Sequence, residues 1–166
     1  MKSYSERCVF PPALVRLHAF LSDVLERFDS SPYGLESGNE LRCHELTRAV
    51  KRFLQHGDVP YHPPNITLFD GKYSVVDHSW LELLLQKGDP GKAGTDDPGF
   101  AGTSLYILDV YAVGQLPQVQ LLDIAFSLPH RANYRAQARR DDIDMDVVNL
   151  VSLDLMSIGR KIFNDE

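Results

Sequence analysis

The chain has 166 residues, of which 43% are apolar and 24% are charged, and these proportions are typical of globular domains. They exclude a fibrous repeat and a chain that is disordered throughout. Acidic residues number 23 and basic residues 17, so the net charge is −6. This balance argues against a general nucleic-acid coat, because such proteins need a surplus of Lys and Arg.

The sequence contains no recognisable membrane or export segment. No apolar run approaches the roughly 20 residues that a membrane-spanning helix needs, and residues 1–7 lead into no signal-type apolar segment. We therefore expect a cytoplasmic protein without a membrane partner, and an effector secreted by a non-classical route is the alternative. The two cysteines, Cys8 and Cys43, are too few for a disulfide scaffold or a four-thiolate zinc site, so two free thiols are expected.

Helical patterns come first along the chain. A Pro-Pro pair opens a segment over 11–28 in which apolar residues recur at helical spacing. Residues 33–40 contain two glycines and one asparagine and predict a loop. A second helix is predicted over 41–55, with Gly57 as its end. The prolines in 60–64 then favour an extended connection.

The pattern next changes to strands. Two strand-like runs, 66–69 and 73–85, flank an Asp-Gly dipeptide at 70–71, which favours a hairpin turn at that point. Further strands are predicted over 105–113 and 119–124 from their β-branched, aromatic and leucine side chains. Antiparallel neighbours joined by a hairpin are the simplest arrangement of these runs.

The remaining segments are a loop, a connection and a last helix. Residues 86–104 are rich in Gly and Pro and predict a flexible inserted loop, because these residues prevent regular structure. Residues 129–140 predict a polar connection that is partly helical. A final helix is predicted to start at Asp141 or Asp142 and to continue to Phe163. Its apolar middle indicates burial in the core or in a subunit interface.

This order of elements predicts the fold class. Two helices precede a run of antiparallel strands and one helix follows, which is typical of an α+β domain with helices packed on one face of its sheet. We expect residues 1–166 to form a single domain of this kind, with the loop over 86–104 inserted in it.

Three residues have the positions that a thiol catalyst needs. Cys43 lies in the first turn of the second predicted helix, where backbone N–H groups and the helix dipole favour a thiolate. His78 lies on the strand after the hairpin, and Asp109 is an acid among apolar residues on a later strand, where it needs a partner. Neighbouring antiparallel strands could place Asp109 beside His78, with Cys43 at the other ring nitrogen. Thiolate, base and orienting carboxylate would then form an activated nucleophile.

The same residues carry a resemblance to a known superfamily. Cys43 at a helix start, the motif His78-Ser79-Trp80 on a strand and Asp109 on the next strand together resemble the transglutaminase-like branch of the papain-like cysteine hydrolases. The similarity covers roughly 41–113. It implies a papain-like, transglutaminase-like core, a Cys-His-Asp triad and chemistry through a thioester intermediate. Members of such families hydrolyse peptides, deamidate glutamine or transfer acyl groups to amines.

Three further residues are candidates for the oxyanion site or for substrate contact. The backbone N–H of Cys43 is the first expected oxyanion donor, and Asn39 is the candidate for the second. His44 follows Cys43 directly, about 100° around the helix, so we expect it to face solvent or to shape the entrance and not to act as the base. Trp80 shares a strand face with His78 and either forms a wall of the site or lies in the core.

Two alternatives concern the same side chains. Cys43 falls on the same helical face as apolar residues, so a buried structural thiol is the first alternative. The second is a zinc site, whose ligands could come from Cys43, His44, His56, His62 and His78. No pair of these has the short spacing of common zinc sites, so we expect no metal.

A basic run precedes the final helix. Arg131, Arg135 and Arg139 are four residues apart, and on a helix they would form a stripe able to hold a phosphate, an acidic partner or RNA. The alternative is a solvated face that pairs with the aspartates in 141–144, and this interpretation is favoured in an acidic protein. Nucleic acid is therefore not expected as a partner.

The sequence predicts a cysteine-dependent hydrolase or acyltransferase that acts on amide bonds of a protein or peptide substrate, as a peptidase, a deamidase or a transglutaminase-like enzyme. The expected chemistry requires no cofactor. The alternative is a non-catalytic protein-binding module on the same fold. In either case the C-terminal helix could form the interface of a homodimer.

Overall fold

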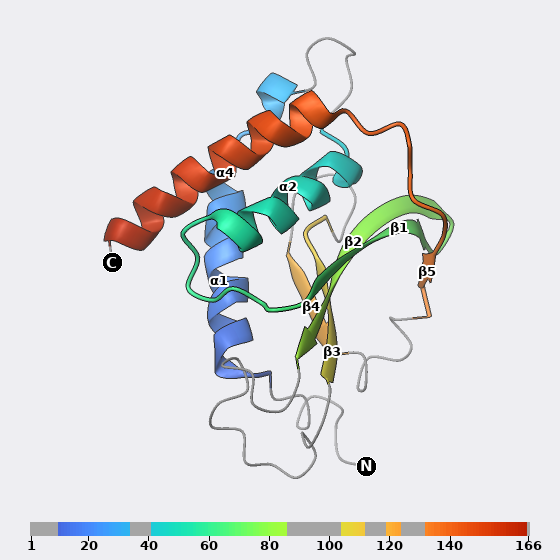
Figure 1. Cartoon of the computed structure of the whole chain (residues 1–166), viewed down its shortest axis with the longest axis horizontal. Coiled ribbons are helices and arrows are strands. Elements are labelled where there is room, and N and C mark those ends of the chain that lie inside the picture. Colours follow the sequence, from blue (N-terminus) through green and yellow to red (C-terminus); the bar gives the residue numbers. More distant parts are fainter. Residues whose placement is uncertain (1–9, 34–40, 86–103, 112–118, 124–131, 166) are drawn as a thin grey trace.

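The computed structural model describes residues 10–33, 41–85, 104–111, 119–123 and 132–165. In this part of the chain three α-helices lie on one side of a five-stranded antiparallel sheet (Figure 1). This arrangement confirms the α+β class, with N-terminal helices, Cys43 at a helix start and a C-terminal helix. None of the described helices is both long and apolar enough to cross a membrane.

Helix α1 (Pro12–Arg27) begins at the proline pair, as predicted. Pro12 lies in the first turn, where its missing N–H removes no helical hydrogen bond. Leu14, Leu17 and Leu21 follow at helical spacing and are buried. The helix ends before Phe28, and a short 3-10 helix, η2 (Ser31–Tyr33), follows.

Helix α2 (Cys43–His56) is packed between the sheet and the last helix, α4 (Met145–Asp165). It buries side chains around most of its circumference, as a helix covered on two sides must. Figure 1 shows α4 running across its outer side. The two helices approach closely at Gly159, where a methyl group would lie only 2.5 Å from Cζ of Phe53.

The capping residue of α4 differs from the prediction. Oδ1 of Asp144 accepts the backbone N–H groups of Asp146 and Val147, at 3.1 and 3.2 Å, and thereby caps the helix. The predicted starting residues, Asp141 and Asp142, lie before the helix. The side chain of Asp142 is instead engaged in ion pairs with two arginines, so it serves a tertiary contact.

The sheet contains five described strands in the order β4-β3-β2-β1-β5, and all of their pairings are antiparallel. The strands are β1 (Ile66–Tyr73), β2 (Val76–Leu85), β3 (Ser104–Asp109), β4 (Gln120–Asp123) and β5 (Tyr134–Ala136). β2 is longer than its neighbour β3, so the first part of β2 extends past the end of β3. His78 lies on this extension, and Asp109 is the last residue of β3. Of the inserted loop predicted over 86–104, residues 86–103 lie outside the described residues.

The hairpin between β1 and β2 forms, but its turn is not at 70–71. Tyr73 pairs with Val76, so the turn consists of Ser74 and Val75. Ser74 has a φ of 56°, in the left-handed region that a tight turn requires. The Asp-Gly pair instead lies within β1, because Asp70 and Gly71 each contact residues distant in the sequence.

Gly71 is required by the strand on the outer side of β1. It pairs with Ala136 of β5, and a Cβ at Gly71 would lie 2.0 Å from the backbone oxygen of Arg135. Only a residue without a side chain allows β5 to approach this closely. Asp70, its neighbour, is buried and forms an ion pair with Arg48 of α2.

β5 lies in a segment for which the sequence predicts a polar, partly helical connection. Arg135 is part of this strand, and its Nη2 donates to the backbone oxygen of Ser74 at 2.7 Å. Arg135 therefore does not lie on a helix, as the less favoured basic stripe would require, and Arg131 lies outside the described residues. Arg140, which follows Arg139, pairs with Asp142, as the interpretation of this segment as a solvated face expects.

The two faces of the sheet bury different clusters. Leu81, Leu83 and Leu85 of β2 point toward the helices and join the main core. Trp80 and Ile107 point the other way and form a second, smaller cluster with Leu122. The alternation along β2 therefore places the ring of Trp80 on the face opposite the helices.

Candidate active site

Cys43 is the first residue of α2. The preceding residue, Arg42, has an extended backbone and provides no side-chain cap, while its carbonyl accepts the N–H of Leu46 at 3.2 Å. The first backbone N–H groups of α2 therefore have no capping side chain from Arg42, and Cys43 lies at the same end of the helix. These N–H groups and the positive end of the helix dipole stabilise negative charge at this position.

Polar contacts hold the start of α2 against the segment that precedes α4. The guanidinium of Arg42 is paired with Glu45 one turn later and with Asp142, whose Oδ2 lies 3.1 Å from Nη1. Oε1 of Glu45 also accepts the N–H of Asp144 at 3.2 Å. These contacts fix the helix start in position, so Cys43 is held by residues distant in the sequence.

His78 and Asp109 form a buried pair, as expected from their strands. Nε2 of His78 lies 2.8 Å from Oδ2 of Asp109. The carboxylate is fully buried and 7% of the histidine is exposed. Because Nε2 faces Asp109, Nδ1 is the nitrogen that remains for Cys43.

Asp109 accepts two more hydrogen bonds. The hydroxyl of Tyr134 donates to Oδ2 at 2.7 Å, and the backbone N–H of Tyr111 donates to Oδ1 at 3.0 Å. Burial and the charge of Asp109 raise the pKa of Tyr134 well above its usual range, so this phenol remains a donor. The sequence did not single out Tyr134, because nothing in the local pattern shows that β5 reaches the site.

The electrostatics of Cys43 and His78 favour a thiolate beside an imidazolium. Burial raises the pKa of Cys43, but hydrogen bonds and charge from His44 and His78 outweigh it and lower the pKa to about 6. Burial lowers the pKa of His78, but Asp109 and Cys43 outweigh it and raise the pKa to about 9. Between these values the two groups exist as an ion pair.

Three aromatic rings surround His78. Trp80 stacks on it with 6.4 Å between ring centroids and an interplanar angle of 16°, and Tyr73 and Tyr134 lie at 6.0 and 6.3 Å. These rings restrict the rotation of the imidazole. Trp80 itself is 1% exposed, so of its two predicted positions the structure favours the core, where it supports the ring of His78.

His44 is buried, which corrects the expectation that it faces solvent. Only 5% of the residue is exposed, and Nδ1 lies 2.7 Å from Oγ of Ser79 and 3.7 Å from Sγ of Cys43. The start of α2 packs on β2, where Oγ1 of Thr47 also donates to the backbone oxygen of Ser79 at 3.3 Å. The residue after Cys43 therefore meets a strand and not solvent.

Asp70 determines which groups donate and which accept in the hydrogen bonds that connect it through Ser79 to His44. Burial raises its pKa, but bonds from Arg48, Ser79 and the N–H of Arg140 outweigh it and lower the pKa, so Asp70 is an anion that only accepts. Ser79 must donate its proton to Asp70, at 2.5 Å, and its oxygen then accepts the Nδ1 proton of His44. Nδ1 of His44 has no lone pair left to accept a proton from Cys43.

The geometry therefore brings together the three residues that the sequence proposes as a triad and adds two that it missed as site residues, Tyr134 and Ser79. Asn39, the candidate second oxyanion donor, lies outside the described residues, as does Cys8. In the described part of the chain no three His, Cys, Asp or Glu side chains are placed to hold a metal ion. His62, one of the candidate zinc ligands, instead has Nδ1 at 2.7 Å from the backbone oxygen of Leu54.

Comparisons with known proteins add no relatives. The chain has no significant match among protein-family models, curated protein sequences or solved structures.

Proposed function

We propose that this chain is a cysteine-dependent hydrolase or acyltransferase that acts on amide bonds through a thioester intermediate, as the resemblance to transglutaminase-like, papain-like enzymes implies. The observation that carries the proposal is the buried contact of 2.8 Å between His78 and Asp109, together with Cys43 at the start of α2. The pKa of Cys43, lowered to about 6, and the pKa of His78, raised to about 9, support it. Opposite shifts of this kind are typical of a catalytic dyad.

The proposed reaction begins with the thiolate of Cys43. Its sulfur attacks the amide carbonyl, a C–S bond forms, and the N–H groups at the start of α2 stabilise the oxyanion. The imidazolium of His78 gives its proton to the amine as the C–N bond breaks, which leaves a thioester. Water or a second amine then attacks the thioester, neutral His78 accepts its proton, and the C–S bond breaks to restore the thiolate.

Asp109 has a supporting part in this scheme. Its contact with Nε2 keeps a proton on that nitrogen and directs Nδ1 toward the thiol. The hydroxyl of Tyr134 and the N–H of Tyr111 hold the carboxylate in place. Both are neutral donors, so they leave the negative charge of Asp109 to stabilise the imidazolium.

The decisive experiment is a pH titration of the Cys43 thiolate, followed by its ultraviolet absorbance and by its rate of alkylation with iodoacetamide. A Cys8→Ser background leaves Cys43 as the only thiol. We expect a midpoint near 6 that rises toward the ordinary 9.0 in the His78→Gln variant. A midpoint near 9.0 in both proteins would overturn the proposal, because no activated thiol would then exist.

Activity is then measured with casein as the protein substrate. Hydrolysis is followed as the release of peptides, deamidation as the release of ammonia, and acyl transfer as the attachment of a biotinylated primary amine. Cys43→Ser provides the zero of each assay, and the product that is lost in this variant identifies the reaction. If no product depends on Cys43 although the titration succeeds, the substrate is outside the amides of casein.

We also propose that the outer side of α4 binds a protein partner, for which a second copy of this chain is the candidate. Leu150 and Leu153 are 55% and 64% exposed on this helix, whose opposite side packs on α2. Sedimentation of the protein and of Leu153→Glu tests this, since a dimer through α4 should dissociate in the variant. A monomer at all concentrations would reject the homodimer.

We also propose a cytoplasmic location for the protein, and fractionation of cells that produce it tests this location.

A further inference from the structure

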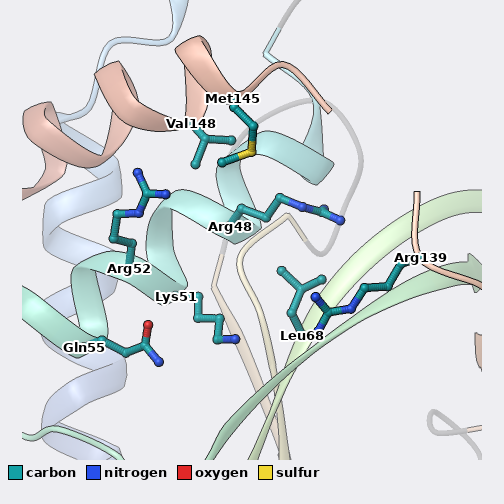
Figure 2. A pocket seen from close by; sticks show the side chains of 8 residues that line it. All are labelled: Arg48, Lys51, Arg52, Gln55, Leu68, Arg139, Met145 and Val148. Atoms are coloured by element: carbon teal, nitrogen blue, oxygen red, sulfur yellow. The ribbon is translucent and has the colours of Figure 1, made fainter. Parts of the chain in front are cut away.

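A pocket lies between α2, β1 and the start of α4. Its volume is about 320 Å³, which is at the lower end of the range for small-molecule sites. Its walls come from α2, β1, the segment after β5 and the start of α4 (Figure 2). The described residues that line it are Arg48, Lys51, Arg52, Gln55, Leu68, Arg139, Met145 and Val148.

The lining is strongly basic, although the chain as a whole has a net charge of −6. Of the described lining residues four are cationic and none is acidic. Lys51 of α2 and Arg139 of the segment after β5 extend toward the space beside Leu68 (Figure 2). This convergence is a local excess of positive charge that the composition does not predict.

Most of this charge is not compensated within the protein. Arg48 is paired with Asp70, whose Oδ2 lies 2.6 Å from Nη2. Arg52 donates to the side-chain oxygen of Asn149, which is neutral and leaves the charge of Arg52 in place. Among the described residues neither Lys51 nor Arg139 has a carboxylate within ion-pair distance. Lys51 and Arg139 therefore face the pocket without a counter-charge, and Arg52, whose side chain extends toward α4 in Figure 2, adds a third uncompensated positive charge at its wall.

The pocket also has an apolar side. Leu68 and Val148 are buried there, and Met145 lies beside them at the start of α4. An anion with an attached organic group would thus find charge and apolar contact in the same cavity. A phosphate carries a charge of about −1.5 to −2 near neutral pH and offers several acceptor oxygens. It therefore matches three uncompensated cations better than a single carboxylate does.

We propose that this pocket binds a phosphate group carried by a small organic molecule. Lys51 and Arg139 contact the phosphate oxygens, Arg52 adds long-range attraction, and the apolar side chains contact the organic part. Arg48 also connects the pocket to the thiol site, because it holds Asp70, which bonds to Ser79 beside His44. The proposal does not depend on the activity of Cys43, since it concerns binding alone.

The test measures the binding of four ligands by titration calorimetry and by the thermal midpoint of unfolding, at constant ionic strength because salt screens exposed charges. The ligands are phenyl phosphate, benzoate, inorganic phosphate and acetate. The first pair differ only in the anionic group, and inorganic phosphate shows whether the organic part contributes. We expect phenyl phosphate to bind best, inorganic phosphate more weakly, and the two carboxylates not at all.

The variant Lys51→Gln/Arg139→Gln should weaken the binding of phenyl phosphate by about tenfold or more. Arg160→Gln/Lys161→Gln, near the other end of α4, removes the same charge and is the matched control, in which binding should be unchanged. Equal loss in both variants, no binding of phenyl phosphate, or equal binding of benzoate would overturn the proposal. Cys43→Ser should bind as the unmodified protein does, so a failure of the thiol chemistry leaves this result intact. Circular dichroism verifies that each variant is folded.

Discussion

The two histidines beside Cys43 are each connected to a buried aspartate, but in different ways. His78 contacts Asp109 directly at 2.8 Å. His44 reaches Asp70 only through the hydroxyl of Ser79, over distances of 2.7 and 2.5 Å. Each side of the thiol thus has a histidine and a buried aspartate, but only His78 contacts its aspartate directly.

The partners of the two carboxylates explain why this difference matters. Asp70 is paired with the guanidinium of Arg48. This ion pair compensates the negative charge of Asp70, so little of that charge is left to stabilise a cation at His44. Among the described residues Asp109 has no Lys or Arg in ion-pair distance, and its other donors are neutral. Its charge is therefore left to stabilise the imidazolium of His78. The influence of a buried carboxylate on a histidine depends on what else compensates that carboxylate.

The largest expected difference between the two sides is in the variants of the histidines themselves. His78→Gln should raise the pKa of Cys43 from about 6 toward 9.0, because it removes the cation that faces the thiolate. His44→Gln should also raise it, because His44 contributes to the lowered pKa of Cys43. We expect the smaller rise in this variant, since Nδ1 of His44 lies 2.7 Å from Oγ of Ser79 and 3.7 Å from the sulfur of Cys43. Titration of the thiolate absorbance in both variants measures this. A larger rise of the Cys43 pKa in His44→Gln than in His78→Gln would contradict the claim that His78 is the main partner of the thiolate.

The next largest effect is expected when each carboxylate is replaced by an amide. The reactive ion pair should exist between pH values of about 6 and 9. Asp109→Asn should narrow this window from both ends, because His78 then loses its proton at a lower pH and Cys43 keeps its proton to a higher pH. Asp70→Asn should leave the window nearly unchanged, although it lowers stability by leaving Arg48 unpaired. The pH dependence of Cys43 alkylation in the two variants measures the window.

Stability should change with pH in a related way. The raised pKa of His78 contributes stability that is complete below about 6.5, its unfolded value, and is lost as the pH rises through its folded value. The lowered pKa of Cys43 contributes in the opposite sense, since its stability is complete above 9.0 and is lost as the pH falls through about 6, so the contribution of His78 is measured in a Cys43→Ser background. In that background Asp109→Asn should remove most of the loss of stability with rising pH. Chemical unfolding of both proteins across the same pH range provides the measurement, and an unchanged slope would contradict the assigned role of Asp109.

The positions of Cys43, His78 and Asp109 in the fold could be predicted from the sequence because each has a local reason. Cys43 begins an amphipathic helix, and Asp109 is an acid among apolar residues on a strand, so a buried partner was to be expected. The order of the strands then placed His78 near Asp109. The fold class followed from the same periodicities.

The features that the sequence did not predict are the position of the hairpin turn, the role of Tyr134 and the burial of His44. They depend on contacts between residues distant in the sequence. The Asp-Gly pair at 70–71 is typical of a turn, yet Asp70 is held by Arg48 of α2 and Gly71 by the close approach of β5. β5 is only three residues long, too short for an alternating pattern, so Tyr134 could not be connected with Asp109. His44 was expected to face solvent or to shape the entrance, and the first alternative is wrong because β2 covers the start of α2, which the sequence does not show.

A smaller effect on the thiol is expected from Ser79→Ala. Without the hydroxyl, Asp70 keeps Arg48 and the N–H of Arg140, so the ion pair with Arg48 remains. Nδ1 of His44 then loses its acceptor and is free to interact with Cys43 alone. The pKa of Cys43 should change little, while the loss of a buried hydrogen bond costs about 1–3 kcal/mol of stability. A shift as large as that in His78→Gln would mean that the two sides are not distinct.

The smallest effect on the thiol is expected from Tyr134→Phe, which removes one of the two neutral donors of Asp109. His78 remains at Oδ2 and the N–H of Tyr111 at Oδ1, so the charge of Asp109 still faces the imidazole. With one donor fewer, that charge is less dispersed, and the pKa of His78 should remain raised. We expect an unchanged Cys43 titration together with a loss of about 1–3 kcal/mol in the free energy of unfolding, because a hydrogen bond to a buried anion is removed. Thiolate titration and urea unfolding of the same sample measure both quantities. If the titration of Cys43 instead moves as far as in Asp109→Asn, Tyr134 does more than hold the carboxylate, and the orientation of the whole His78–Asp109 pair depends on β5.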